Sequence, residues 1–156
     1  MFEQSLLCAE DLMTRDVAVV HPETSLLAAV TMMAAKRISG LPVVDADGAP
    51  LGMLTEGDLL RWHAEFSERQ TWWLDHLADG MELAPNFIAV LKAERRKVAT
   101  VMTHGLTSVA PDTLARDIVK LFSEKGIKRV PVVKGGKIIG MVSRSDLVGA
   151  MAKELG

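Results

Sequence analysis

The chain has 156 residues, of which 49% are apolar and 24% are charged, which is typical of a globular protein that buries a substantial core. Its net charge of −2 excludes a global positive field of the kind that captures nucleic acid. The single cysteine, Cys8, excludes an internal disulfide framework, and no stretch approaches the ~20 apolar residues that span a membrane. We therefore expect a cytoplasmic protein with no membrane attachment.

The first half of the chain predicts a short lead-in followed by strand, helix, two strands and helix. The expected elements are a lead-in at 1–10, an apolar strand at 17–20, a helix from Thr24, strands at 41–44 and 51–54, and a helix that Asp58 opens. Pro22 disfavours helix at the residue before it and marks a turn. Thr24 or Ser25 can cap the helix that follows, in which apolar residues recur at helical spacing.

The same order returns in the second half. The stretch Gly52-Met-Leu-Thr-Glu-Gly-Asp58 recurs 88 residues later as Gly140-Met-Val-Ser-Arg-Ser-Asp146. Landmarks that precede the predicted hairpins are offset by 89, so one residue is missing from the second hairpin turn. In the second copy Ser108-Val-Ala-Pro111 matches Val19-Val-His-Pro22, and a helix is expected from Thr113. A repeat that changes length only in a turn indicates two copies of one fold.

Residues 63–98 separate the copies and have no counterpart in the repeat. Ser67 to Gln70 fits a capping box, and Pro85 fits the first turn of a second helix, so we expect a helical linker. Trp62, Trp72 and Trp73 are found in or beside this segment. The paired tryptophans favour contact with a partner or a second copy of the chain.

Each repeated stretch ends in a hydroxyl residue followed three positions later by an aspartate, an arrangement called here the elbow (55–58 and 143–146). A carboxylate has two acceptor oxygens for the vicinal hydroxyls of a ribose. The hydroxyl and the helix amides can receive phosphate or ribose oxygens. A competing interpretation is that Asp58 and Asp146 simply cap helices. Repetition at the same position favours binding, and the two roles are compatible.

The repeated pattern, with Leu41-Pro-Val-Val44 and Val130-Pro-Val-Val133 before the elbows, resembles a tandem pair of cystathionine-β-synthase (CBS) domains, a Bateman module. The resemblance implies an α/β (α+β) fold in which two β-α-β-β-α repeats pack about a pseudo-twofold axis, with an inserted helical linker. The predicted division is a lead-in at 1–10, a first repeat at 11–62, the linker at 63–98 and a second repeat at 99–156. Such modules commonly form homodimers.

The resemblance also implies two ligand clefts, each joining the elbow of one repeat to strands of the other. The first would use Met53, Thr55, Asp58, Thr107, Ser108, Ile127, Lys128, Arg129 and Pro131. The second would use Val19, Ser39, Gly40, Pro42, Ser143, Ser145 and Asp146.

The two predicted clefts differ in charge. Lys128 and Arg129 place two cations where the family binds phosphates, whereas the matching Ser39 and Gly40 place none. The first cleft is therefore expected to be the stronger site for phosphorylated nucleotides. A solvated pair of cations at a strand entrance is the alternative for Lys128 and Arg129.

No motif of an enzyme is found, and the four histidines are too scattered to suggest a metal site. The sequence thus predicts a non-catalytic regulatory module that requires no cofactor. Its regulatory ligand would be AMP, ADP, ATP, NAD or S-adenosylmethionine, and it would signal to a separate effector protein. The alternative is a constitutive dimeric scaffold that acts through the tryptophan-rich linker. No nucleic-acid partner is expected.

Overall fold

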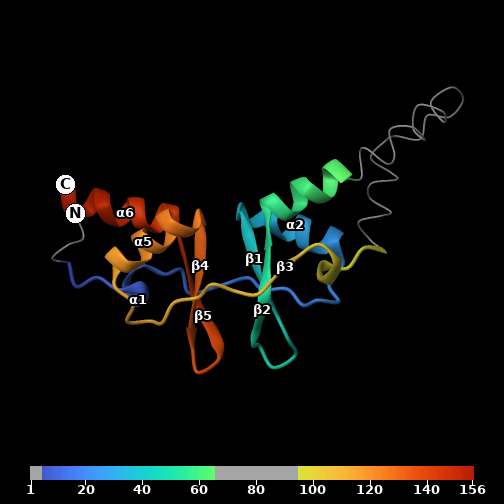
Figure 1. Ribbon diagram of the computed structural model, residues 1–156, viewed down its shortest axis with the longest axis horizontal. Helices are drawn as coiled ribbons and strands as arrows, with labels where there is room; N and C mark the ends of the chain where they lie inside the picture. The colour runs from blue at the N-terminus through green and yellow to red at the C-terminus, as the bar shows by residue number, and fades with distance from the viewer. Residues whose placement is uncertain (1–4, 66–94) are drawn as a thin grey trace, which may run out of the picture. The chain divides into compact units, whose positions relative to one another are not determined.

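The computed structural model describes residues 5–65 and 95–156, which divide into two compact units (Figure 1). Of the described residues, the first-repeat unit comprises 19–46, 51–65 and 95–105. The second-repeat unit comprises 5–18, 47–50 and 106–156. Each unit is thus assembled from segments that are far apart in the sequence.

The first-repeat unit contains one three-stranded sheet with helices around it. Its elements are α2 (Leu26–Lys36), β1 (Gly40–Val44), β2 (Pro50–Thr55), a helix over 56–65, the short 3-10 helix η1 (Val98–Thr100) and β3 (Thr103–His104). The strand order is β1-β2-β3, and β3 runs antiparallel to β2 with Met53 opposite Thr103. All five residues of β1 are buried, which explains why this strand is continuously apolar.

The second-repeat unit repeats this plan around a two-stranded antiparallel sheet. Its elements are α1 (Ala9–Leu12), α5 (Ala115–Lys125), β4 (Arg129–Lys134), β5 (Lys137–Ser143) and α6 (Arg144–Leu155). Gly135 and Gly136, at φ +60° and +75°, make the tight turn between the strands. The predicted α+β class and the two-copy organisation are therefore confirmed, whereas the pseudo-twofold axis stays a prediction.

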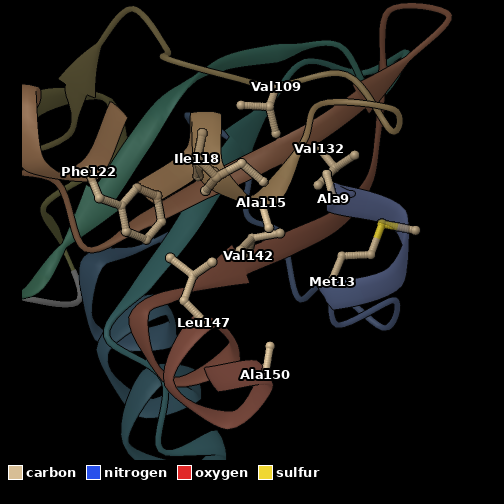
Figure 2. Packing of buried hydrophobic residues seen from close by; sticks show 11 residues of the cluster. Ala9, Met13, Val109, Ala115, Ile118, Phe122, Val132, Val142, Leu147 and Ala150 are labelled. Carbon is tan, nitrogen blue, oxygen red and sulfur yellow. The ribbon is translucent and has the colours of Figure 1, made fainter. Parts of the chain in front are cut away.

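The apolar core of the second-repeat unit draws on every one of its elements (Figure 2). Its buried members are Ala9, Met13, Val109, Ala115, Ile118, Phe122, Val130, Val132, Val142, Leu147 and Ala150. Ile118 and Phe122 lie four residues apart on α5 and therefore on one face of that helix. Ala9 and Met13 come from the N-terminal part of the chain, although the rest of the core lies beyond residue 108.

Each repeat receives the segment that precedes the other repeat, and we call residues 7–14 and 96–103 the leading segments. The Ala9 amide donates to the Thr113 carbonyl (2.8 Å), and the Ala115 amide donates to Leu7 (2.8 Å). In the first-repeat unit the Val98 amide donates to Thr24 (2.9 Å) and the Leu26 amide to Arg96 (2.8 Å). These bonds correspond one to one under the 89-residue offset. The exchange of leading segments is therefore a property of the repeat.

The lead-in predicted for residues 1–10 is consequently part of the fold where it is described. Ala9 is fully buried, and Cys8 forms a β-bridge with Leu114. The Cys8 amide and thiol donate to Asp11, and the bond from the amide in particular lowers the pKa of that carboxyl below its ordinary value.

The strand predicted at 17–20 and its match beside Ser108 are reduced to single parallel bridges, Val20 with Val43 and Val109 with Val132. Two hydrogen bonds hold each bridge, for example from the Val20 amide to Pro42 (3.0 Å) and from the Val44 amide to Val20 (2.9 Å). Pro22 and Pro111 follow closely and cannot donate to a ladder, so the pairing ends there.

Two helix starts also differ from the prediction. The helix predicted from Thr113 begins at Ala115, because the Thr113 hydroxyl accepts from the Ala110 amide and closes the turn before it. Helix α2 begins at Leu26, with the Ser25 hydroxyl accepting from the Ala28 amide (3.1 Å) as its cap.

The expected linker helices, with Trp72 and Trp73, lie outside the described residues. Within the part of the chain that is described, no helix is long and apolar enough to cross a membrane.

The strand before each elbow contains a glycine, and a methionine of the leading segment packs closely against it. A β-carbon at Gly140 would lie 2.9 Å from Met13 Cβ and 2.7 Å from its Cγ. At Gly52 it would lie 2.6 Å from Met102 Cε and would also collide with the Thr103 carbonyl. Only glycine fits at positions 52 and 140, because the methionine side chains approach the backbone there too closely for a β-carbon.

We predict that Gly140→Ala destabilises the protein by about 1–3 kcal/mol, because the new methyl group forces Met13 out of its packed position. Urea denaturation measures the effect. Gly149→Ala is the matched control: its β-carbon would have no atom within 4 Å, and alanine in a helix interior stabilises by up to about 1 kcal/mol over glycine. Equal stability of the two variants would contradict the packing described above.

Candidate functional site

The first elbow holds the carboxylate of Asp58 in a closed network of donors. Asp58 is only 3% exposed. Its Oδ2 accepts from the Thr55 amide (2.9 Å) and hydroxyl (3.1 Å). Its Oδ1 accepts from the Thr103 hydroxyl (2.7 Å) and from Nη2 of Arg61. Both carboxylate oxygens are thus occupied by groups of the same unit.

The second elbow repeats only half of this network. Asp146 Oδ2 accepts from the Ser143 amide (2.8 Å) and hydroxyl (3.0 Å), which makes a capping box at the start of α6. Among the described residues, Asp146 Oδ1 has no hydrogen-bond partner. The carboxylate is half-buried. One acceptor oxygen of Asp146 is therefore available to a ligand.

One difference in hydrogen bonding and one difference in residue type produce this contrast. Thr14 occupies the position of Thr103, with its backbone paired to Met141 as Thr103 is paired to Met53. Its hydroxyl nevertheless makes no bond to Asp146 in the described part of the chain. Gly149 occupies the position of Arg61 and therefore offers no side chain at all.

Most amides at the two helix starts already have acceptors. The Glu56 amide donates to Ser39, and the Arg144 amide donates to Lys128 (both 3.0 Å). The amides of Asp58 and Asp146 donate to the hydroxyls of their own elbows (3.3 Å each). The aspartates therefore stand at the third helical position, and the prediction that Asp58 opens its helix is wrong by two residues.

One amide remains at each helix start. Within the described residues, the N–H groups of Gly57 and Ser145 have no hydrogen-bond partner. An amide with the positive end of a helix dipole behind it favours an anionic or hydroxyl oxygen. At the second elbow this donor accompanies the free Asp146 oxygen, so the elbow offers both a donor and an acceptor.

The structure divides each predicted set of site residues between the two units. The first-repeat unit contains Val19, Ser39, Gly40, Pro42, Met53, Thr55 and Asp58. The second-repeat unit contains Thr107, Ser108, Ile127, Lys128, Arg129, Pro131, Ser143, Ser145 and Asp146. The two predicted clefts therefore stay a prediction. Within a unit, the structure brings the strand entrance to the elbow of the same repeat.

In the second-repeat unit, the start of β4 lies beside the elbow at 143–146. Arg129 stands opposite Ser143 in the β4–β5 register, and the Lys128 carbonyl accepts from the first amide of α6. The Ser39 carbonyl has the same role beside Thr55 in the first-repeat unit. Lys128, Ser108 and Ser145 are exposed, whereas Pro42 and Pro131 are buried.

Two residues that donate to Asp58 of the first elbow were missed by reasoning from the sequence. Arg61 could have been found, because Asp and Arg three positions apart meet on one face of a helix. Thr103 could not, because it reaches Asp58 across 45 residues through the exchange of leading segments. Among the described residues, no three His, Cys, Asp or Glu side chains cluster so that they could hold a metal ion.

We predict that Thr103→Val lowers the free energy of unfolding by about 1–2 kcal/mol, because a buried carboxylate loses a short hydrogen bond. Thr14→Val is the matched control, since it alters the equivalent position of the other repeat without removing a bond to Asp146. Thermal and urea unfolding followed by circular dichroism compare the two variants. A loss of stability as large in Thr14→Val would refute the role assigned to Thr103.

Comparison with known proteins supports the two-copy interpretation. The family model for the CBS domain matches this chain twice, at residues 9–65 and 98–153. A curated relative, the uncharacterized protein MJ1426 of Methanocaldococcus jannaschii, is 31% identical over 155 residues, which cover 94% of this chain and 92% of that protein.

Solved structures agree with the family model. The crystal structure of CBSX2 of Arabidopsis thaliana in complex with AMP has a TM-score of 0.72 at 26% identity, and the match covers 96% of this chain and 98% of that chain. The CBS domain pair of protein MJ0100, solved with 5′-methylthioadenosine and S-adenosyl-L-methionine, has a TM-score of 0.70 over 96% and 98% of the two chains. At 18% identity it shows the fold alone. The chain belongs to the CBS-domain family and carries two copies of the domain.

Proposed function

We propose that this protein is a non-catalytic regulatory module that binds adenine nucleotides or related adenosyl ligands at its two elbows and signals to a separate partner protein. The observation that carries the proposal is the Asp146 elbow, in which a free carboxylate oxygen and the Ser145 amide stand together at the start of α6. The CBSX2 structure supports the ligand class, because that relative was crystallised with AMP.

The chemistry of a ribose fits this arrangement. The free Oδ1 of Asp146 accepts one ribose hydroxyl, and the charge on the carboxylate strengthens that bond. The Ser145 amide donates to a second ligand oxygen at the positive end of the helix. Since Oδ2 remains bound to Ser143, the carboxylate is held in place before the ligand arrives, which lowers the entropic cost of binding.

The phosphate groups are assigned to the cations of the first predicted set. We place the phosphorylated nucleotide with Asp58, Lys128 and Arg129, and a weaker or less charged adenosyl ligand with Asp146, Ser39 and Gly40. This ranking depends on the charges in the sequence, since a guanidinium contacts phosphate through two bonds and an ammonium acts as a point charge. A bound ligand regulates only if it has different affinities for two arrangements of the protein.

We further propose a homodimer formed through the elbow helices. Leu60, on the helix over 56–65, and Val148, on α6, are 71% and 62% exposed. They are equivalent positions of the repeat, so a large apolar side chain faces outward at the same place in both copies. Repetition of an exposed apolar position indicates a shared contact surface better than a single one would.

We predict that AMP, ADP, ATP, NAD or S-adenosylmethionine binds the protein and raises its melting temperature. Ligand at ~100 times its dissociation constant stabilises a protein by about 2.7 kcal/mol. Isothermal titration calorimetry on the wild type, Asp58→Asn and Asp146→Asn then assigns the sites. We expect each variant to lose about tenfold or more in affinity at its own elbow, because a charged acceptor is lost.

The control for these titrations is Asp117→Asn, which removes an exposed carboxylate of α5 outside both elbows. It should bind as the wild type does. Absence of binding and of any thermal shift with all five ligands would refute the proposed function and favour the scaffold. Equal affinities of the two elbows for AMP, ADP and ATP in the wild type would refute the ranking of the two sites.

For the dimer we predict that Leu60→Glu or Val148→Glu shifts the protein towards the monomer, because a charge buried in the contact lacks a partner. Sedimentation velocity over a range of concentrations measures the shift. Ser123→Glu, an exposed position on α5, adds the same charge elsewhere and should leave the oligomeric state unchanged. A monomeric wild type, or dimers in all variants, would contradict the proposed contact.

A further inference from the structure

The two elbows differ most at one pair of equivalent positions, Arg61 and Gly149. Nη2 of Arg61 donates to Asp58 Oδ1, and the Arg61 side chain is 70% exposed while the Asp58 side chain is 2% exposed. Arg61 also lies over the helix start, where Nη1 would be 3.6 Å from a β-carbon placed on Gly57. The equivalent residue, Gly149, has no side chain, and a β-carbon added there would have no atom within 4 Å.

We infer that Arg61 is a built-in competitor for the ribose at the first elbow, so that this elbow selects its ligand mainly by phosphate while the Asp146 elbow selects by the ribose diol. The inference rests on the proposed function and specifies what each elbow recognises. It depends on the bond from Arg61 to Asp58 at the first elbow, and on the lack of a side chain at Gly149 beside the second.

Asp58 Oδ1 has no lone pair left for a ribose hydroxyl. A carboxylate oxygen has two lone pairs, and those of Asp58 Oδ1 are taken by Thr103 and Arg61. A ribose hydroxyl can reach Oδ1 only after one of these donors leaves. Thr103 is fixed by its place in β3, whereas the exposed guanidinium of Arg61 is free to swing into water. Arg61 is therefore the donor that a ribose displaces.

The exposure of Arg61 sets the size of the effect. An ion pair whose cation is largely in water contributes little, because solvent screens it and a long side chain must be ordered. Displacement of Arg61 therefore weakens ribose binding by about three- to tenfold and does not abolish it. After displacement the guanidinium remains within reach of the helix start, where it attracts a phosphate. The same residue thus lowers selectivity for the diol and raises selectivity for the anion.

The test compares AMP with 2′,3′-dideoxy-AMP by isothermal titration calorimetry on the full chain. In the wild type we expect the dideoxy analogue to lose affinity strongly at the second elbow and weakly at the first, with Asp58→Asn and Asp146→Asn used to assign the two sites. Arg61→Met keeps an unbranched helix-forming side chain and removes the guanidinium. It should raise diol-dependent affinity at the first elbow about three- to tenfold.

The reciprocal variant transfers the competitor to the other elbow. Gly149→Arg places a guanidinium three residues after Asp146, as Arg61 stands after Asp58, and should lower AMP affinity at the second elbow about three- to tenfold. Gly149→Met is its matched control, because it restores a side chain to the helix without a charge and should bind AMP as the wild type does. Circular dichroism establishes that each variant is folded before titration.

The outcomes separate this inference from the proposed function. If neither the wild type nor Arg61→Met binds AMP or another adenosyl ligand, the proposed function fails and this inference fails with it. If the wild type binds AMP but Arg61→Met leaves the affinity and the diol dependence of the first elbow unchanged, only the inference is overturned. A smaller ratio of AMP affinity to 2′,3′-dideoxy-AMP affinity at the first elbow of Arg61→Met would also overturn it, because Arg61 would then support diol binding and not compete with it.

Discussion

The exchange of leading segments is the constraint on which the rest of the structure depends. Residues 7–14 complete the core beside α5 and α6, and residues 96–103 complete the sheet beside β2. Neither repeat buries its apolar face with its own continuous sequence. Gly52 and Gly140 make the exchange possible, because only a residue without a β-carbon lets Met102 and Met13 approach so closely. The same approach brings Thr103 to the first elbow, so packing and the chemistry of the site are linked.

Within the elbows, helix capping and ligand binding use the same carboxylate. Two of the bonds to each aspartate are local and recur in both copies, since the hydroxyl and amide three residues earlier occupy Oδ2. These bonds stabilise the helix start and orient the side chain. The second oxygen distinguishes the copies: Oδ1 of Asp58 is closed by Thr103 and Arg61, whereas Oδ1 of Asp146 has no partner among the described residues. Capping therefore does not compete with binding, because it uses Oδ2. Whether Oδ1 has a partner decides whether each elbow is available to a ligand.

Much of the fold could be predicted because its signals are local and occur twice. The Pro-Val-Val strands, the hairpin turns and the elbows recur at constant spacing, and a coincidence in both copies is improbable. The strand predicted at 17–20 and its match beside Ser108 are single bridges because prolines end the pairing, and α5 starts later than predicted because Thr113 closes a turn. The site was predicted less completely. Its aspartates follow from the pattern, but one of the donors that occupy Asp58, Thr103, lies 45 residues away.

The sequence by itself determined the number of repeats, the order of their elements and the two capped elbows, because each depends on residues within one helix turn or one hairpin. It also contained the difference between Arg61 and Gly149, which lies three residues from each aspartate. Only the tertiary structure decided that each leading segment packs on the other repeat, that residues 7–10 belong to a core and that Thr103 reaches Asp58. These features are contacts between distant segments, and no local pattern specifies which surface will bury an apolar segment or which carboxylate oxygen will remain open.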